Sequence, residues 1–369
     1  MILETRYLPV GSLPYETVKS VTAMEAKLYS KCPFIAVLPA ISPDENIEKW
    51  TFANLPGVSY NDNSLVLKTG SHDYKDKVLM HSRAFGNPNA ENLEQYAFEP
   101  AFLEKFFQMI KKFKSPVAYI NLLGPFTISQ ILSKVVKEQV ITDKNYKRLY
   151  FEAVCIKALW IINKMKDFCK NTVPVIILEE PMLGQFGMIK RQHDEITSDF
   201  VIELYERVVK KLKSAGAVVG VQCMDKCDWS LPIRGGVDLI SYDAYNNPNN
   251  LCIIPDIITS FLERGGVINW GIIPVTSESM VKNLTIEYMS NRLAFSMQGL
   301  VLSGVPEILV QNSAMVSMNG STDHLSIFFA EKAIILSTQL SLRLDSIFNV
   351  KVKFPIINHN SISNKGMCH

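Results

Sequence analysis

Short apolar, β-branched segments alternate with segments of helical periodicity along most of the chain, and this alternation limits the possible folds more than any other feature. The strand-like segments are 7–10, 117–122, 173–178, 218–221, 239–242, 267–270 and 307–310. The helical segments are 16–30, 101–113, 147–169, 198–214, 281–303 and 323–342. Strands that alternate with helices predict βαβ units and a parallel sheet with buried strands.

The number of βα units favours a closed sheet. At least six or seven such units fit into about 340 residues, which predicts a single (β/α)₈ TIM barrel. A doubly wound open sheet is the alternative. That fold usually carries a Gly-rich phosphate-binding turn after its first strand, and the segment Val10-Gly11-Ser12-Leu13-Pro14 does not fit this pattern.

One long segment interrupts the alternation. Residues 31–98 are rich in Pro, Asn, Asp and Gly, and we expect them to form an excursion that packs beside the mouth of the barrel. The barrel is predicted to span residues 1–345. Residues 346–369 are polar, with several Asn and Ser, and are expected to form a loosely ordered tail. The sequence has no internal repeat and no interdomain linker.

Composition argues against several classes of protein. The chain has 38 basic and 36 acidic residues and a net charge of +2, which gives no electrostatic case for binding nucleic acid or an anionic membrane. It begins without a secretory signal pattern and contains no run of about 18 apolar residues that would cross a membrane. Seven scattered Cys suit reduced thiols, so we expect a cytoplasmic protein. The oligomeric state stays open.

In a barrel of this kind, functional side chains follow the carboxyl ends of the strands. Glu179 and Glu180 come directly after five apolar residues, where two carboxylates are costly to bury unless they are paired. They would serve as a clamp for an amine or as a general acid and base. The alternative is a strand-end Glu that caps a helix or pairs with Arg or Lys. The position at a barrel strand end favours the functional interpretation.

Other candidate residues at strand ends carry weaker signals. Cys223 and Cys227 form a C-x₃-C pair, but structural zinc pairs usually have a second pair elsewhere, so two ordinary buried thiols are favoured. Asp243 is either a metal or hydrogen-bond acceptor or the cap of a loop. Trp229 and Trp270 could line a pocket, although aromatic side chains in a barrel more often serve packing.

Several enzyme classes lack their motifs. None of the six His residues follows a predicted strand, and the sequence has no H-x-x-x-H pair. It also has no G-x-S-x-G elbow and no phosphate-binding P-loop. A serine hydrolase and a nucleotide kinase are therefore unsupported.

Five short segments, in order along the chain from about residue 8 to residue 340, resemble the catalytic domain of cobalamin-independent methionine synthase. They are most similar to the short single-barrel relatives of that domain. The superfamily also holds uroporphyrinogen decarboxylase and the corrinoid-linked thiol methyltransferases. The segments are Val10-Gly11-Ser12-Leu13-Pro14, Leu123-Gly124-Pro125-Phe126-Thr127, Ile177-Leu178-Glu179-Glu180-Pro181-Met182-Leu183, Cys227-Asp228-Trp229 and Ile240-Ser241-Tyr242-Asp243-Ala244-Tyr245.

The resemblance implies methyl transfer to a small thiol such as homocysteine, the last step of methionine biosynthesis. In this family a zinc ion binds the acceptor thiol, lowers its pKa and presents a thiolate. A strand-end Ser and an acidic pair before Pro hold the amino acid, which here are Ser12, Glu179 and Glu180. The first acidic residue is usually Asp, so Glu179 is one methylene longer. The expected catalytic residues are Glu179, Glu180 and Asp243, and the expected substrate-binding residues are Gly11, Ser12, Gly124, Thr127, Gln222, Trp229, Tyr245 and Trp270.

The metal-binding positions depart from the family pattern. The family has His-x-Cys after the strand that ends here at Val221, and this chain has Gln222-Cys223-Met224. Asp243 keeps the carboxylate of a further ligand. The last Cys of the family falls near the end of the segment 307–310, within residues 311–315, where no Cys occurs. One carboxylate does not hold zinc tightly, although Cys223, Cys227 and Asp243 together could rebuild a site.

Three functions therefore remain open. The first is a methyltransferase acting on a small thiol, with a folate donor disfavoured because the chain has no room for a second barrel and with a methylated corrinoid protein as the alternative donor. The second is a metal-free enzyme of the same superfamily, although a single Arg before residue 80 disfavours a porphyrin substrate. The third is a protein without activity that binds an amino acid or a partner protein.

Overall fold

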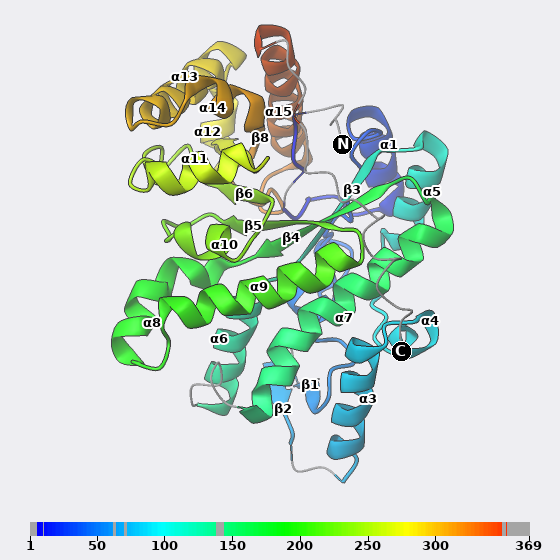
Figure 1. Cartoon of the computed structure of the whole chain (residues 1–369). Helices are drawn as coiled ribbons and strands as arrows, with labels where there is room; N and C mark the ends of the chain where they lie inside the picture. Colours follow the sequence, from blue (N-terminus) through cyan, green and yellow to red (C-terminus); the bar gives the residue numbers. More distant parts are fainter. Residues whose placement is uncertain are drawn as a thin grey trace, which may run out of the picture.

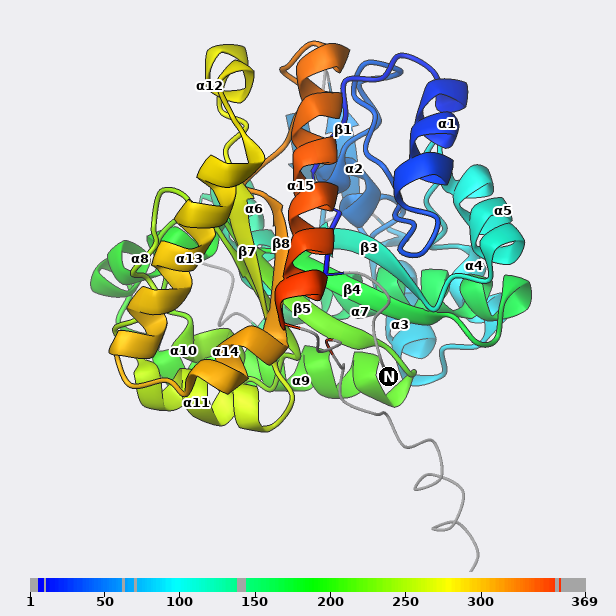
Figure 2. The same cartoon turned by 90° about the horizontal axis from the view of Figure 1, so that it is seen from above.

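The computed structural model describes residues 6–9, 11–61, 64–69, 72–137, 144–348 and 352, with residues 144–148 described by their backbone alone. Its centre is a curled sheet of six parallel strands (Figures 1 and 2). Each strand pairs with the next strand along the chain, so the predicted βαβ order is confirmed. The strands are β3 (Val117–Leu123), β4 (Val173–Glu179), β5 (Val218–Cys223), β6 (Leu239–Tyr242), β7 (Val267–Ile273) and β8 (Ala314–Met318).

Two N-terminal segments lie between the edges of this sheet and pair with it through single bridges. Tyr7 pairs with Val316 of β8, and Phe34 pairs with Tyr119 of β3, both in parallel orientation. A third bridge joins the two N-terminal segments to each other at Ser12. The predicted first strand is thus an isolated bridge at Tyr7 in the described residues, and Val10 lies outside them.

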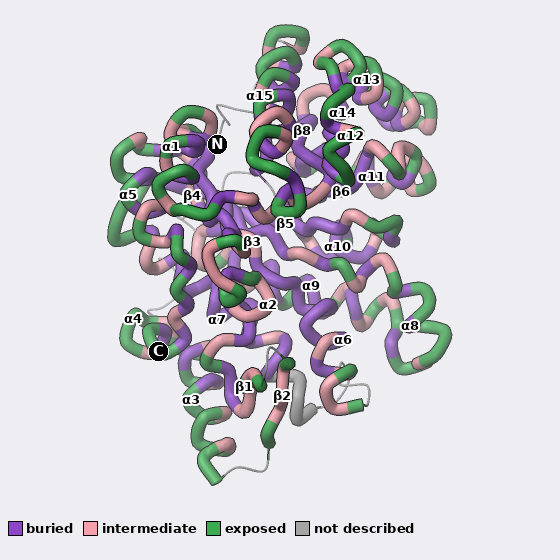
Figure 3. The backbone as a smooth tube through the Cα atoms, turned by 180° about the vertical axis from the view of Figure 1, so that it is seen from behind, coloured by how far each residue is buried: buried purple, intermediate pink, exposed green. Residues whose placement is uncertain are grey.

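Helices cover the outer side of the sheet and return the chain between strands (Figure 1). Figure 3 shows that the buried residues gather along the strands and the inward sides of these helices. The predicted helices at 16–30, 101–113, 147–169, 198–214 and 323–342 are confirmed within a few residues. The main covering helices are α1 (Val18–Leu28), α5 (Leu103–Phe113), α6 (Pro125–Val136), α7 (Lys144–Phe168), α9 (Ser198–Ser214), α10 (Ser230–Arg234), α11 (Pro255–Glu263) and α15 (Ile327–Phe348).

The prediction of a strand at 307–310 is wrong, because this segment begins α14 (Glu307–Ser313) and β8 begins only at Ala314. Three apolar residues do not distinguish a strand from a helical turn, and Gln311 Nε2 donates to Glu307 Oε1 one turn away, as in a helix. The predicted helix 281–303 is two helices, α12 (Glu278–Lys282) and α13 (Ile286–Leu302). The break falls where Thr285 caps α13.

The predicted excursion contains ordered elements of its own. They are α2 (Ile47–Phe52), a hairpin of β1 (Val58–Asn61) and β2 (Ser64–Leu67), α3 (Tyr74–Gly86) and α4 (Ala90–Glu94). The α2 helix lies at the carboxyl end of β3, where Leu123 N donates to Thr51 Oγ1 over 3.4 Å. The α3 and α4 helices pack on α7.

The C-terminal boundary differs from the expected one by a few residues. The α15 helix continues to Phe348, so the first three residues of the predicted tail belong to that helix. Residues 349–351 and 353–369 lie outside the described residues. None of the helices in the described part of the chain combines the length and the apolar character that a membrane crossing requires.

A buried lysine joins the excursion to α7. Lys157 Nζ donates to Ala53 O over 2.6 Å and to Tyr96 O over 2.7 Å, and its side chain is buried. Burial lowers the pKa of Lys157 to about 7. Between this pH and the ordinary lysine pKa the unfolded chain binds more protons than the folded chain, so stability rises with pH there.

We therefore expect Lys157→Met to remove part of the rise in stability between pH 7 and pH 10. Urea unfolding of both proteins at pH 7, 8, 9 and 10 measures this difference, and the other titrating groups cancel in the comparison. Parallel pH profiles for the two proteins would contradict the expected burial of an uncharged amine.

Candidate functional site

The two faces of the sheet differ in chemistry, and the adjacent residues Glu179 and Glu180 lie on opposite faces. Successive side chains of a strand point to opposite faces. Glu180 points outward, because its carboxylate binds the first turn of α6 and Tyr205 of α9. Glu179 therefore faces the inner side of the curl. There Asn121 Nδ2 donates to Glu179 Oε1 over 2.8 Å, and both side chains are half-buried.

A row of polar side chains crosses this inner face. The strand register pairs Glu179 with Gln222, Gln222 with Ser241, and Ser241 with Asn269, and paired residues of parallel strands share a face. Asn269 Nδ2 donates to Ser241 Oγ over 2.8 Å and to Ser317 Oγ over 2.7 Å. Glu179, Gln222, Ser241, Asn269 and Ser317 thus form a row of hydrogen-bonding groups near the carboxyl ends of β4 to β8, which we call the inner-face row.

Two acceptors in the inner-face row have no hydrogen-bond partner among the described residues. They are Gln222 Oε1 and Asn269 Oδ1, and the Gln222 side chain is only 8% exposed. A buried amide oxygen without a partner costs free energy, and a ligand that donates a hydrogen bond removes this cost. Burial also raises the pKa of Glu179, which the hydrogen bond from Asn121 partly offsets. The inner face therefore offers several acceptors to a ligand rich in N–H groups.

Glu180 has a different surrounding from Glu179. It is fully buried, and it accepts hydrogen bonds from Phe126 N at 3.1 Å, Thr127 N at 2.7 Å and Tyr205 Oη at 3.0 Å. The two backbone donors belong to the first turn of α6, where N–H groups lack helical partners and a negative charge is favoured. Burial raises the pKa of Glu180 to about 7. These contacts favour the helix-capping interpretation of this carboxylate.

Gly124 and Thr127 surround the same carboxylate. A Cβ at Gly124 would lie 2.2 Å from the carboxyl carbon of Glu180, so only glycine leaves room for the cap. Thr127 donates its N–H to the carboxylate, and its Oγ1 accepts from Met182 N over 3.3 Å. The geometry therefore gives both predicted substrate-binding residues a structural task beside Glu180.

Asp243 follows β6 and contacts the segment that follows β8. Its Oδ1 accepts from Asn246 N over 2.9 Å and from Asn319 Nδ2 over 3.2 Å, and its Oδ2 accepts from Asn246 Nδ2 over 2.6 Å. The resemblance expects the last metal-binding Cys at the end of the last strand. Because β8 ends at Met318, that position is occupied by Asn319 and does not fall in the segment 311–315. An amide stands there, in contact with Asp243.

The residues at these strand ends do not fit a zinc ion. Gln222 offers an amide, and both Asp243 oxygens accept hydrogen bonds from amides. Cys223 follows Gln222 and points to the opposite face, where its thiol lies against Cys227, and burial raises the pKa of Cys227 well above its ordinary value. Within the described residues, no three His, Cys, Asp or Glu side chains come together to hold a metal ion.

The predicted aromatic residues lie on the outer face. The Tyr242 ring packs 6.3 Å from Trp229 and 5.5 Å from Trp270, and all three side chains are buried. They contribute packing rather than a lining of the inner face. Tyr245 is half-buried, with its carbonyl accepting from Arg292 Nη2 and its ring 5.0 Å from the Arg292 guanidinium.

Gly11 and Ser12 hold the segment after β8. Gly11 has φ +82, and a Cβ there would lie 2.8 Å from Ser321 Cα. Ser12 N donates to Ser321 Oγ over 2.8 Å, and Thr322 N donates to Ser12 O over 2.9 Å. These two residues therefore bring the N-terminal segment to the strand-end side of β8.

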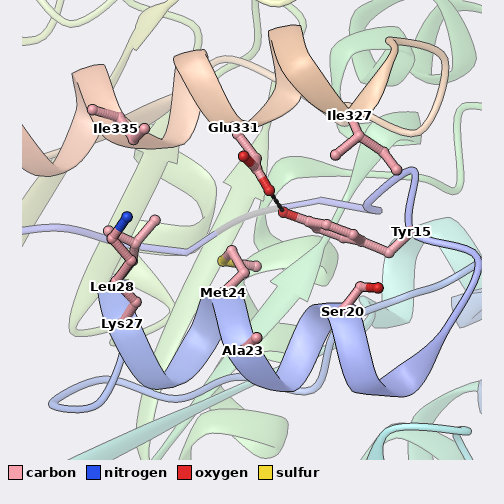
Figure 4. Close-up of a pocket in the computed structure, with 9 residues that line it drawn as sticks. All are labelled: Tyr15, Ser20, Ala23, Met24, Lys27, Leu28, Ile327, Glu331 and Ile335. Atoms are coloured by element: carbon pink, nitrogen blue, oxygen red, sulfur yellow. Dashed lines mark hydrogen bonds between the residues drawn. The ribbon is translucent and has the colours of Figure 1, made fainter.

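Three cavities lie outside the sheet. One of about 390 Å³ separates α1 from α15, with Tyr15 Oη donating to Glu331 at its rim (Figure 4). A second, of about 400 Å³, lies beside α13 and α14, and a third, of about 310 Å³, lies between α6 and α8 (Phe186–Gln192). None of these three cavities is lined by the polar residues of the inner face.

The sequence analysis named Glu179, Gln222 and Asp243 but missed their neighbours. Asn121, Ser241, Asn269 and Ser317 were missed because they lie within strands rather than after them, and Asn319 was missed because the last strand was predicted at 307–310 instead of 314–318. A polar residue at alternate positions inside an apolar strand is a signal that could have found Asn121 and Asn269. No model of a known protein family matches the chain, and no curated protein matches it.

Proposed function

We propose that this chain is a closed (β/α)₈ barrel that binds a small molecule with a protonated amine, such as an amino acid, at the carboxyl ends of its strands and without a metal. Glu179 is the counter-charge for the amine, and Gln222 accepts a further hydrogen bond. The observation that carries the proposal is the half-buried Glu179 carboxylate beside an amide oxygen without a partner. An ammonium group supplies the positive charge and the N–H donors that these two acceptors require.

Barrel closure rests on the three single bridges. They lead from β8 through Tyr7 and Ser12 to the segment at Phe34 and on to β3. With the six continuous strands, the two bridging segments make eight positions around the axis. This arrangement supports a binding site at the strand ends, where barrels carry their functional groups.

The resemblance to cobalamin-independent methionine synthase supports the same site. It distinguishes the residues that would hold the amino acid from those that would bind the thiol-activating metal. Glu179 keeps the carboxylate that would hold the amino acid. Gln222, Asp243 and Asn319 stand where the thiol-activating metal would bind, and they are hydrogen-bonding groups rather than a zinc-binding set. We therefore propose a divergent member of that superfamily that binds an amino acid without thiol activation by zinc.

Metal analysis and a homocysteine methylation assay of the purified protein test this divergence. Stoichiometric zinc together with methyl transfer to homocysteine would overturn it and restore the methyltransferase function.

Isothermal titration with methionine and with homocysteine tests the amine-binding site itself. We expect saturable binding of at least one of them, and we expect Glu179→Gln to weaken it by about 30-fold or more, since a charge-assisted bond is lost. Binding should also weaken as the pH falls through the raised pKa of Glu179, because the protonated carboxyl no longer attracts an ammonium group.

Glu203→Gln is the matched control, because it makes the same change on an exposed carboxylate of α9. This variant should bind like the original protein. If neither amino acid binds, or if Glu179→Gln binds as tightly as the original protein, the assignment of the inner face is refuted.

A further inference from the structure

Two neighbouring helices form one outer face of the molecule. The α13 and α15 helices pack against each other and lie on the same side of the sheet (Figures 1 and 2). Their outward sides are exposed along much of each helix (Figure 3), and α1 faces Ile335 of α15 across the cavity shown in Figure 4. The exposed residues of α13 and α15 therefore determine the chemistry of this outer face.

The exposed side of α13 carries large apolar residues at a seven-residue spacing. They are Tyr288, Phe295 and Leu302, which are 46%, 56% and 79% exposed. Seven residues are close to two turns of helix, so the three side chains form a stripe along one face.

The exposed side of α15 repeats this pattern. Phe328, Ile335 and Leu342 follow one another at the same spacing and are 71%, 37% and 67% exposed. Two adjacent helices thus each present a solvent-exposed apolar stripe. We call these six residues the apolar face.

Charged groups are scarce around the apolar face. Among the exposed residues of α13 the only charge is Glu287, and among those of α15 it is Arg343. These two side chains lie 4.0 Å apart and pair with each other. An outer helix of this fold more usually exposes charged residues, as the α9 helix does. Its exposed residues within the helix include Asp199, Glu203, Glu206, Arg207 and Lys210.

The apolar face has the size of a stable interface. Its six side chains expose roughly 700 Å² at these fractions, and a standard protein–protein interface buries about 800 Å² on each partner. Aromatic enrichment and charge depletion are also the features that distinguish the core of an interface.

We propose that the apolar face is the interface of a homodimer, in which α13 and α15 of one copy pack on the same helices of a second copy across a twofold axis. A twofold contact requires a patch that complements itself, and an apolar stripe with its single pair of charges already neutralised meets this condition. Side chains at a seven-residue spacing also suit ridge-and-groove packing of helix on helix.

The cavity beside α13 and α14 provides a socket at one end of the apolar face. It has a volume of about 400 Å³ and is lined by Met297, Val301, Leu302, Val310 and Phe348, with a few polar residues. A large apolar side chain from the second copy would bury its surface in this socket, which is the geometry of an energetically dominant interface residue.

The mass of the full chain in solution tests the proposal. Light scattering after size exclusion at about 20 µM protein should give twice the mass of one chain. The double variant Phe295→Glu and Leu342→Glu should be monomeric at this concentration, with the dimer dissociation constant raised at least about 100-fold, because each new carboxylate would be buried without a partner. Circular dichroism should show that its helix content is unchanged.

Met188→Glu provides the matched control. Met188 is an apolar residue of α8 with 48% exposure, and it lies outside the apolar face. This variant should remain dimeric. A monomeric original protein at about 20 µM overturns the proposal, and so does a dimer that survives the double variant.

Discussion

Replacing Glu180 with alanine should lower the free energy of unfolding by about 3–5 kcal/mol. The change leaves the N–H groups of Phe126 and Thr127 and the Tyr205 hydroxyl without their acceptor in a fully buried space. Urea unfolding followed by circular dichroism at pH 6 measures the loss.

The pH dependence of this loss follows from the raised pKa of Glu180. Between the ordinary glutamate pKa and about 7 the folded chain binds more protons at this site than the unfolded chain does. The stability that Glu180 contributes is therefore greatest below the ordinary pKa and falls as the pH rises through about 7. The alanine variant should lack this decline.

Glu179→Ala is the control for the Glu180 variant, because the two carboxylates are adjacent and differ in environment. Glu179 is half-buried and accepts a side-chain hydrogen bond from Asn121 alone among the described residues, so its loss should change the stability by less than about 1 kcal/mol. An equal loss from both variants would show that Glu180 is not the specific cap of α6.

Arg6→Met should also destabilise the fold by about 3–5 kcal/mol, because it removes a buried guanidinium together with its ion pair and its bonds to two backbone carbonyls. The Arg6 side chain is 1% exposed, and its Nε lies 3.1 Å from Asp345 Oδ1. Its Nη1 donates to Gln311 O over 2.8 Å and to Ala314 O over 2.9 Å. One guanidinium thus joins the N-terminal segment to α14, β8 and α15.

Urea unfolding measures this loss, with Arg207→Met as the control. Arg207 pairs with Glu203 on the exposed side of α9, and such surface pairs contribute less than about 1 kcal/mol. Hydrogen exchange should add a local signature, with faster exchange of the Leu8 and Val316 amides, which bond across the same junction. Equal stability of the Arg6 and Arg207 variants would contradict this role of Arg6.

The sequence allowed prediction of the elements whose local and tertiary signals agree. The segments at 173–178 and 218–221 are β-branched runs with buried neighbours, and both became strands. The strand prediction for 307–310 was wrong because Ile308, Leu309 and Val310 fit a strand or a helix equally well. The choice depends on where the chain begins to pair with β7, and this pairing begins only at Ala314. The segment at Phe34 was missed because the surrounding Pro and Asn residues concealed a short apolar run.

The candidate site was predicted only in part, for a physical reason. Strand-end position identified Glu179 and Glu180 together, but which of the two faces inward depends on register and on the helix that needs a cap. Gly124 shows the same dependence, since its role becomes evident only when a carboxylate from the next strand fills the space of a Cβ. Contacts between residues more than 50 positions apart leave no local pattern in a sequence.

The three single bridges at Tyr7, Ser12 and Phe34 create a seam beside a firmly laddered half of the sheet. Local opening costs least free energy where hydrogen bonds are fewest, so breathing motions of the sheet should concentrate at this seam. The inner-face row lies on the laddered strands and keeps its geometry during such motions. The proposed ligand would therefore enter and leave past this seam rather than between the paired strands.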